Sequence, residues 1–229
     1  MANIEEARYE AVAAEDGKML VRARYAVRNN QRSFLAVTLP AQATLWSASR
    51  AGRPARPGVS PSGSLLLPLQ KGRTGEDAPV FVVELVYLQR MSAWTQEGDA
   101  RVTLPAVDLP VSRMGMTLFH SPRYDLMVRP GAFRVETDPG PWSSALRLDA
   151  PPPPPAAPET RLRAGGAVDI TMDGIAAKQL RDSYRGVAGV VPVQIALPPF
   201  GSAIFVAAEL TAENHAPALE LRFRRTNDR

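Results

Sequence analysis

The sequence predicts a mainly β protein, an antiparallel β-sandwich built as one or two sandwiches, and three observations lead to this class. Short apolar runs recur at roughly 8–12-residue intervals, separated by Gly, Pro and Asn turns. Several of these runs alternate apolar and polar residues with period two, which is typical of a strand with one solvated face. Helical periodicity is absent from the first half of the chain, and this speaks against βαβ units.

The composition excludes several classes of protein. The chain has 229 residues, 45% of them hydrophobic, and no cysteine. A chain of this length buries enough surface to need no disulfide or metal staple. The missing cysteines exclude disulfide frameworks, zinc fingers, iron–sulfur clusters and thiol catalysis.

The sequence also bears on location. No apolar run approaches the roughly 20 residues that span a bilayer, so no transmembrane segment is expected. Residues 1–6 lack the basic and apolar regions of a signal peptide. We therefore expect a soluble chain, cytoplasmic if it is full-length and periplasmic or in the cell envelope if it is an excised domain.

The charge balance gives no sign of a nucleic-acid partner. The net charge is +4, from 27 basic and 23 acidic residues, and only three of the basic residues are lysines. The arginines are spread along the whole chain, whereas proteins that read bases or phosphates cluster their charge in recognisable motifs. No nucleic-acid binding is expected.

The first strong strand signal covers residues 21–28. Apolar residues at its odd positions alternate with Arg22, Arg24 and Arg28 on the opposite face. The Asn-rich turn that follows tolerates positive φ, and residues 33–39 form the returning strand. These two runs predict a hairpin.

The same pattern repeats along the first 149 residues. The run 80–87 is apolar on both faces, which predicts a central strand covered from two sides, and its one charge, Glu84, must be paired or lie near a strand end. The region 91–116 is less regular. The other predicted strands are 43–49, a short strand after the turn at 52–54, 64–69, 116–120, 124–128, 133–136 and 144–148.

A run of five prolines, 151–155, divides the chain. Such a run forms an extended polyproline II spacer, so we expect a domain at 1–149 and a linker or crossover at 150–160. Residues 161–229 form either a smaller β-rich domain or the completion of the first sandwich. Within them the pattern predicts one short helix near 174–184 and strands at 168–172, 191–197, 204–210 and 219–224.

Motifs for catalysis or cofactor binding are missing. The two histidines, His120 and His215, have no nucleophile elbow to accompany them. Residues 169–174 resemble the start of a calcium loop, but Leu180 occupies the position that requires a bidentate Glu. Gly165 and Gly166 precede a strand rather than a helix, which excludes a phosphate loop. We expect no enzyme, no metal and no cofactor.

Two groups of residues are candidates for a ligand or partner surface. Trp94 and Trp142 lie in loop-like stretches where they could stack on a sugar, but burial is favoured because buried tryptophans are common in β-sandwiches. Trp46 lies in an apolar strand and is expected in the core. Two rows of arginines would either dock an acidic partner or form cross-strand ion pairs with glutamates, and the second is favoured because the net charge is small. These rows are Arg22, Arg24 and Arg28, and Arg222 and Arg224.

Four stretches between residues 21 and 87 share a pattern of short strands and turns: 21–30, 34–40, 45–47 and 79–87. Over roughly residues 15–90 the chain resembles the β-rich domains of large uncharacterised bacterial envelope proteins. The resemblance implies a place in a larger assembly and brings no catalytic motif with it.

The sequence therefore predicts a non-enzymatic structural or protein-interaction β-domain, part of a larger bacterial assembly, with a protein partner. The alternative is a carbohydrate-binding module, with a glycan ligand, or a hydrolase. A hydrolase would show His120 or His215 lining a cleft within reach of a serine or a carboxylate.

Overall fold

The computed structural model describes residues 2–71, 78–148 and 201–226, all of which belong to one compact unit formed by Met1–Asp149 and Val191–Arg229. Fifteen strands and one five-residue helix, α1 (Ser144–Leu148), make up the secondary structure of these residues. Within them, no helix is long and apolar enough to cross a membrane.

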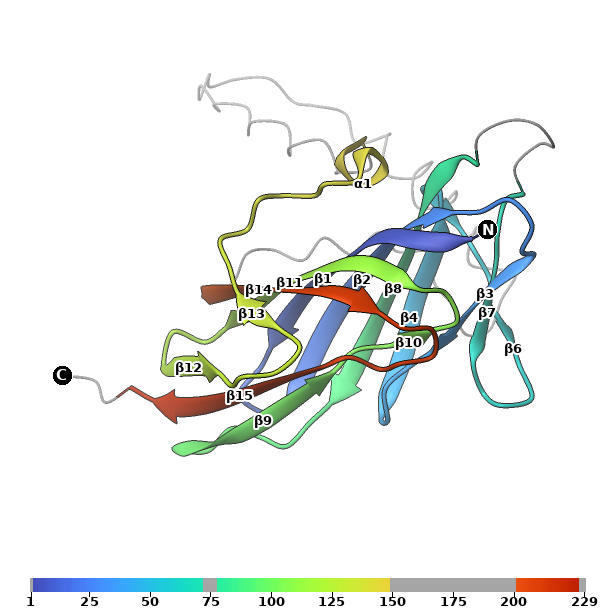
Figure 1. Ribbon diagram of the computed structural model, residues 1–229. Helices are drawn as coiled ribbons and strands as arrows, with labels where there is room; N and C mark the ends of the chain where they lie inside the picture. The colour runs from blue at the N-terminus through green and yellow to red at the C-terminus, as the bar shows by residue number, and fades with distance from the viewer. Residues whose placement is uncertain (1, 72–77, 149–200, 227–229) are drawn as a thin grey trace, which may run out of the picture. The chain divides into compact units, whose positions relative to one another are not determined.

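The largest sheet has eight strands and is mixed rather than purely antiparallel (Figure 1). β1 pairs with β11 in parallel and with β2 antiparallel, and the other pairs are antiparallel. The order across the sheet is β13 (Arg134–Val135), β14 (Ser202–Thr211), β11 (Val111–His120), β1 (Asn3–Ala13), β2 (Lys18–Arg28), β8 (Val80–Arg90), β4 (Ala43–Arg50) and β5 (Arg53–Pro54).

Two smaller sheets complete the unit. One has the order β10 (Ala106–Val107), β3 (Phe34–Thr38), β7 (Leu65–Pro68) and β6 (Gly58–Val59). The other has the order β12 (Tyr124–Val128), β15 (Ala218–Arg225) and β9 (Glu97–Thr103). The two red strands of Figure 1, β14 and β15, thus pair with strands from the first 149 residues.

A single core cluster contains buried residues from all three sheets. In β2 the odd residues Val21, Ala23 and Tyr25 are fully buried in it, as period-two alternation predicts. β8 lies between β2 and β4, and Val83 and Val86, which point to opposite faces, are both fully buried. The prediction of a mainly β, sandwich-type fold is confirmed.

Several element predictions are wrong or incomplete. Residues 144–148 form the helix α1 rather than a strand. β1 and β9 were not predicted, and β11 begins at Val111 instead of 116. The predicted linker at 150–160, the helix near 174–184 and the strands at 168–172 and 191–197 lie outside the described residues.

Close packing of β9 on β15 leads to a prediction. Gly98 lies opposite Phe223, and a Cβ at Gly98 would stand 2.7 Å from the Phe223 ring. We expect Gly98→Ala to lower the free energy of unfolding by about 1–3 kcal/mol, because the ring is held in the core and must move. Urea unfolding followed by circular dichroism measures the change.

The matched control is Gly58→Ala, since a Cβ at Gly58 meets only Leu66 Cβ at an ordinary 3.7 Å. Equal stability of the Gly98→Ala and Gly58→Ala variants would contradict the packing described.

Candidate functional site

The side of β1 that faces away from the core carries three charged residues, Glu6, Arg8 and Glu10. Ala7 and Tyr9, which alternate with them, are buried in the core. Although they are charged, Glu6 and Arg8 are only 1% and 6% exposed. Charges buried to this degree must be paired and hydrogen-bonded, so their partners define the site.

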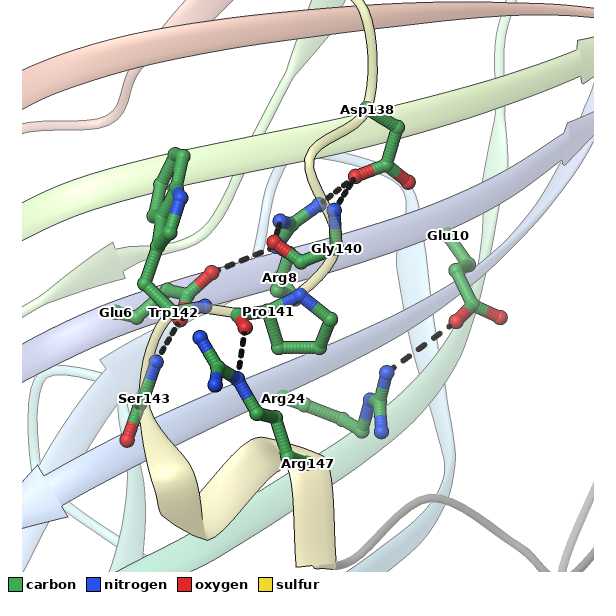
Figure 2. A network of polar contacts seen from close by, with 10 residues as sticks. All are labelled: Glu6, Arg8, Glu10, Arg24, Asp138, Gly140, Pro141, Trp142, Ser143 and Arg147. Carbon is green, nitrogen blue, oxygen red and sulfur yellow. Dashed lines mark hydrogen bonds and ion pairs between the residues drawn. The ribbon is translucent and has the colours of Figure 1, made fainter.

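Arg8 holds three acceptors at once (Figure 2). Its Nε donates to Glu6 Oε1 at 2.7 Å, and its Nη1 donates to Asp138 Oδ1 at 2.7 Å. Its Nη2 donates to the carbonyl of Gly140. The Asp138 carboxylate also accepts from the Gly140 N–H at 2.8 Å. A guanidinium with fixed, planar donors suits this convergence of acceptors.

Glu6 binds the segment around Gly140 as well, through main-chain amides of that segment. Glu6 Oε2 accepts hydrogen bonds from two consecutive N–H groups, those of Trp142 at 2.8 Å and Ser143 at 2.7 Å. We call residues 138–143 the strap, because they run across this face of the large sheet, with a turn at Gly140, whose φ is +73° (Figure 2). The Glu6–Arg8 pair thus binds the strap mainly by its carbonyl and amide groups.

The sequence of the strap prepares it for this binding. Pro139 and Pro141 have restricted φ angles and no N–H. The strap therefore loses little conformational freedom when it docks. Of its remaining amides, Gly140 donates to Asp138, and Trp142 and Ser143 donate to Glu6.

Two further sets of contacts hold the strap in place, the cation–π contacts of Trp142 and the contacts of α1. The Arg113 guanidinium carbon lies 3.0 Å from the centre of the Trp142 ring, and that of Arg8 lies 5.2 Å from it, both cation–π contacts. Beyond the strap, α1 packs Leu146 against residues of β2 and β8, and Arg147 Nε donates to the Pro141 carbonyl at 2.6 Å.

The first predicted arginine row continues the same face. Arg22 and Arg24 both pair with Glu10, and Arg28 pairs with Glu5. All three arginines therefore meet glutamates of β1, the adjacent strand.

The second predicted row, Arg222 and Arg224, lies exposed on β15. Arg222 pairs with Glu97 of β9. Ion pairs Arg101–Glu220 and Arg129–Asp99 lie on the same small sheet and border a shallow hollow of about 260 Å³. The hollow has two acidic and two basic side chains in its lining, so its charge is balanced.

The tryptophans differ in their surroundings. Trp94 is 7% exposed, because its ring stacks on Phe223 at 5.2 Å and meets Tyr124 edge-on, so it lies in the core and not on an open surface for stacking. Trp142 is partly buried in the strap contact. Trp46, expected in the core, is 43% exposed beside a register shift of β4 that follows Leu45.

The histidines do not form a catalytic group with other described residues. His120 is 4% exposed, and its Nδ1 lies 2.9 Å from the carbonyl oxygen of Ser121. His215 is exposed in a turn. Within the described part of the chain, neither ring hydrogen-bonds to a serine hydroxyl or a carboxylate, and no three metal-binding side chains gather.

Comparison with known proteins gives structural neighbours only. No family model matches the chain, and no curated protein matches it. An M1 zinc metallopeptidase from Deinococcus radiodurans is similar over 60% of this chain and 36% of its own, with 12% identity and a TM-score of 0.41. A substrate-bound mutant of an M1 zinc metallopeptidase from the same organism is similar over 97% of this chain and 42% of its own, with 8% identity and a TM-score of 0.44.

Native yeast LTA4 hydrolase is similar over 60% of this chain and 25% of its own, with 9% identity and a TM-score of 0.39. The chain thus spans between a quarter and about two fifths of the length of these structures.

These findings correct two expectations from the sequence, that the chain is a non-enzymatic structural or interaction domain and that it is not an enzyme. The structures that the chain resembles are hydrolases, which goes against both expectations. No catalytic residue, metal or substrate is carried over to this chain from these structures.

The burial of Glu6 leads to a stability prediction. Glu6→Ala leaves Arg8 and two strap amides without their acceptor in a buried place. Removing one partner of a buried pair costs about 3–5 kcal/mol, and we expect a loss of that size in urea unfolding. Glu220→Ala, which removes an exposed pair with Arg101, is the control and should cost less than about 1 kcal/mol. Similar losses in both variants would show that Glu6 is not the anchor.

His120 gives a prediction for pH. Burial lowers the pKa of His120 below its usual 6.5. As the pH falls, the imidazole is therefore protonated at a higher pH in the unfolded chain than in the folded chain. Stability should therefore fall as the pH drops below about 6.5. We expect His120→Gln to flatten the dependence of the melting temperature on pH between about 5 and 7. The same slope in the wild type and His120→Gln would contradict this assignment.

Proposed function

We propose that this chain is the β-rich, polypeptide-holding part of a hydrolase that acts on peptides, with catalytic groups that lie outside the described residues. The observation that carries the proposal is the way in which the Glu6–Arg8 pair binds the strap. Glu6 accepts two consecutive main-chain N–H groups, and Arg8 donates to a main-chain carbonyl.

Main-chain groups are common to all peptides, so this chemistry suits a partner whose sequence varies. Charge-assisted hydrogen bonds of this kind are stronger than neutral ones, and in a buried place they are less screened than in water. Holding an extended chain in one orientation is what a peptide hydrolase needs before any bond is cleaved. In this structure the strap, which turns at Gly140, supplies the bound segment from the same molecule.

A glycan is less well supported as the ligand. The two tryptophans predicted to stack on a sugar are engaged elsewhere, Trp94 with Phe223 and Trp142 with Arg113. A sugar needs an open aromatic face, and each of these rings already has such a contact on one face.

We also propose, from the resemblance over residues 15–90, that the protein works within a larger assembly at a bacterial cell envelope, with residues 150–160 as a proline-rich linker. Cell fractionation with an antibody against this chain tests the location. Recovery in the cytosolic fraction alone would overturn it.

Peptide cleavage by the native protein that contains this chain tests the function. The protein is purified through an antibody against the chain and incubated at neutral pH with a mixture of synthetic peptides, with and without added zinc chloride. We expect new peptide termini to accumulate with time in mass spectra, and a heat-denatured sample is the control. The absence of new termini under both conditions would overturn the proposal.

A competing peptide tests the part played by the Glu6–Arg8 pair. A synthetic peptide with the sequence of the strap, Asp-Pro-Gly-Pro-Trp-Ser, should slow cleavage, whereas a scrambled peptide of the same composition should not. If the strap peptide leaves the rate of peptide cleavage unchanged, the hydrolase activity does not depend on the site formed by Glu6 and Arg8.

A further inference from the structure

The described edges of the three sheets differ in length. The eight-stranded sheet ends in β13 and β5, and the four-stranded sheet ends in β10 and β6, each only two residues long. Very short edge strands are a common protection against unwanted pairing. The three-stranded sheet instead ends in five-residue β12 and seven-residue β9, so β9 is the longest edge among the described strands.

The main chain of β9 presents a regular row of hydrogen-bonding groups along this edge. The N–H of Leu104 donates to Pro217, and the N–H of Arg225 donates to the carbonyl of Gln96. The register between β9 and β15 has no shift, so even-numbered residues of β9 bond to β15. The amides and carbonyls of odd-numbered residues from 97 to 103 therefore point away from β15. Of these, the Glu97 carbonyl accepts a hydrogen bond from the Thr95 hydroxyl at 3.2 Å.

The charged side chains of β9 do not guard this edge. Glu97 pairs with Arg222, Asp99 with Arg129, and Arg101 with Glu220. Two of these partners lie on β15, and Arg129 directly follows β12. The side chains are therefore drawn over the sheet, away from the edge of β9.

We propose that two copies of this chain pair antiparallel through β9, about a two-fold axis at Ala100. This register places Asp99 opposite Arg101 of the second copy, and Arg101 opposite its Asp99. It also places Glu97 opposite Thr103 of the second copy. The pattern is thus self-complementary in charge, as a two-fold interface requires. In this register each intrachain ion pair can persist and no like charges meet, whereas a register with Arg101 opposite Arg101 would be destabilised.

The residues at the axis fit the pairing as well. Asp99 and Arg101 form hydrogen-bonded pairs across the axis, because their main-chain groups point outward. Ala100 then faces Ala100 of the second copy as a non-hydrogen-bonded pair, in which the side chains come closest. A small side chain suits this position. The pairing does not depend on which reaction the protein catalyses.

Charge reversal in two separate variants tests the pairing. Asp99→Arg alone places Arg opposite Arg, and Arg101→Asp alone places Asp opposite Asp, so each variant should sediment as a monomer of about 24.8 kDa. A mixture of the two variants restores both opposed charges and should form a heterodimer. The wild type should form a homodimer with twice the monomer mass as its concentration rises. Circular dichroism confirms that each variant is folded.

A cysteine reporter gives an independent measurement, since the chain has no cysteine of its own. The Cα atoms of the paired Ala100 residues would lie roughly 4.5 Å apart, within the range of a disulfide. Ala100→Cys should therefore cross-link under mild oxidation at least about tenfold faster than Thr103→Cys, whose two copies would lie roughly 20 Å apart along the strands. A wild type that stays monomeric at the highest soluble concentration, or equal cross-linking of the two cysteine variants, would overturn the proposal.

Discussion

The burial of one ion pair, Glu6 with Arg8, is the constraint on which the polar side of the large sheet depends. Removing two charges from water costs several kcal/mol for each ion, and their mutual attraction offsets this only when their other hydrogen-bonding positions are filled. The strap fills them, with two amides for Glu6 and a carboxylate and a carbonyl for Arg8. The ion pair and the strap therefore stabilise each other, and neither is expected to persist without the other.

Strands with large apolar residues on one face could be predicted from the sequence, and strands with small ones could not. β2 and β8 carry Val, Leu and Tyr on their buried faces and were recognised. β1 buries mostly alanines between charged residues, and a register shift after Ile4 breaks its alternation. β9 alternates charged residues with Gly98 and Ala100, so its inner face gives almost no hydrophobic signal.

The candidate site was harder to predict because its parts lie far apart in the sequence. Arg22, Arg24 and Arg28 were identified, but their glutamate partners lie on β1, the unrecognised strand. The sequence marks Trp142 as a possible ligand contact, but does not show that its ring lies against Arg113 and Arg8. A signal for the strap was present in the sequence, since Asp-Pro-Gly-Pro-Trp-Ser has two prolines that favour an extended chain with few amides of its own. Nothing local indicates that Glu6, more than 130 positions earlier, accepts two of those amides.

Charge pairing within the described unit also bears on how it can recognise a partner. The carboxylates of Glu6, Glu10 and Asp99 are each paired with an arginine of the same chain. A charged ligand that bound one of these groups would first have to break an existing pair, and it would leave the other partner without its counter-charge. Main-chain recognition carries no such cost, because amides and carbonyls can be added at an edge or exchanged on a face without removing an ion pair. The charged side chains of this unit therefore determine the geometry and register in which a partner binds, while main-chain amides and carbonyls make the contacts with it.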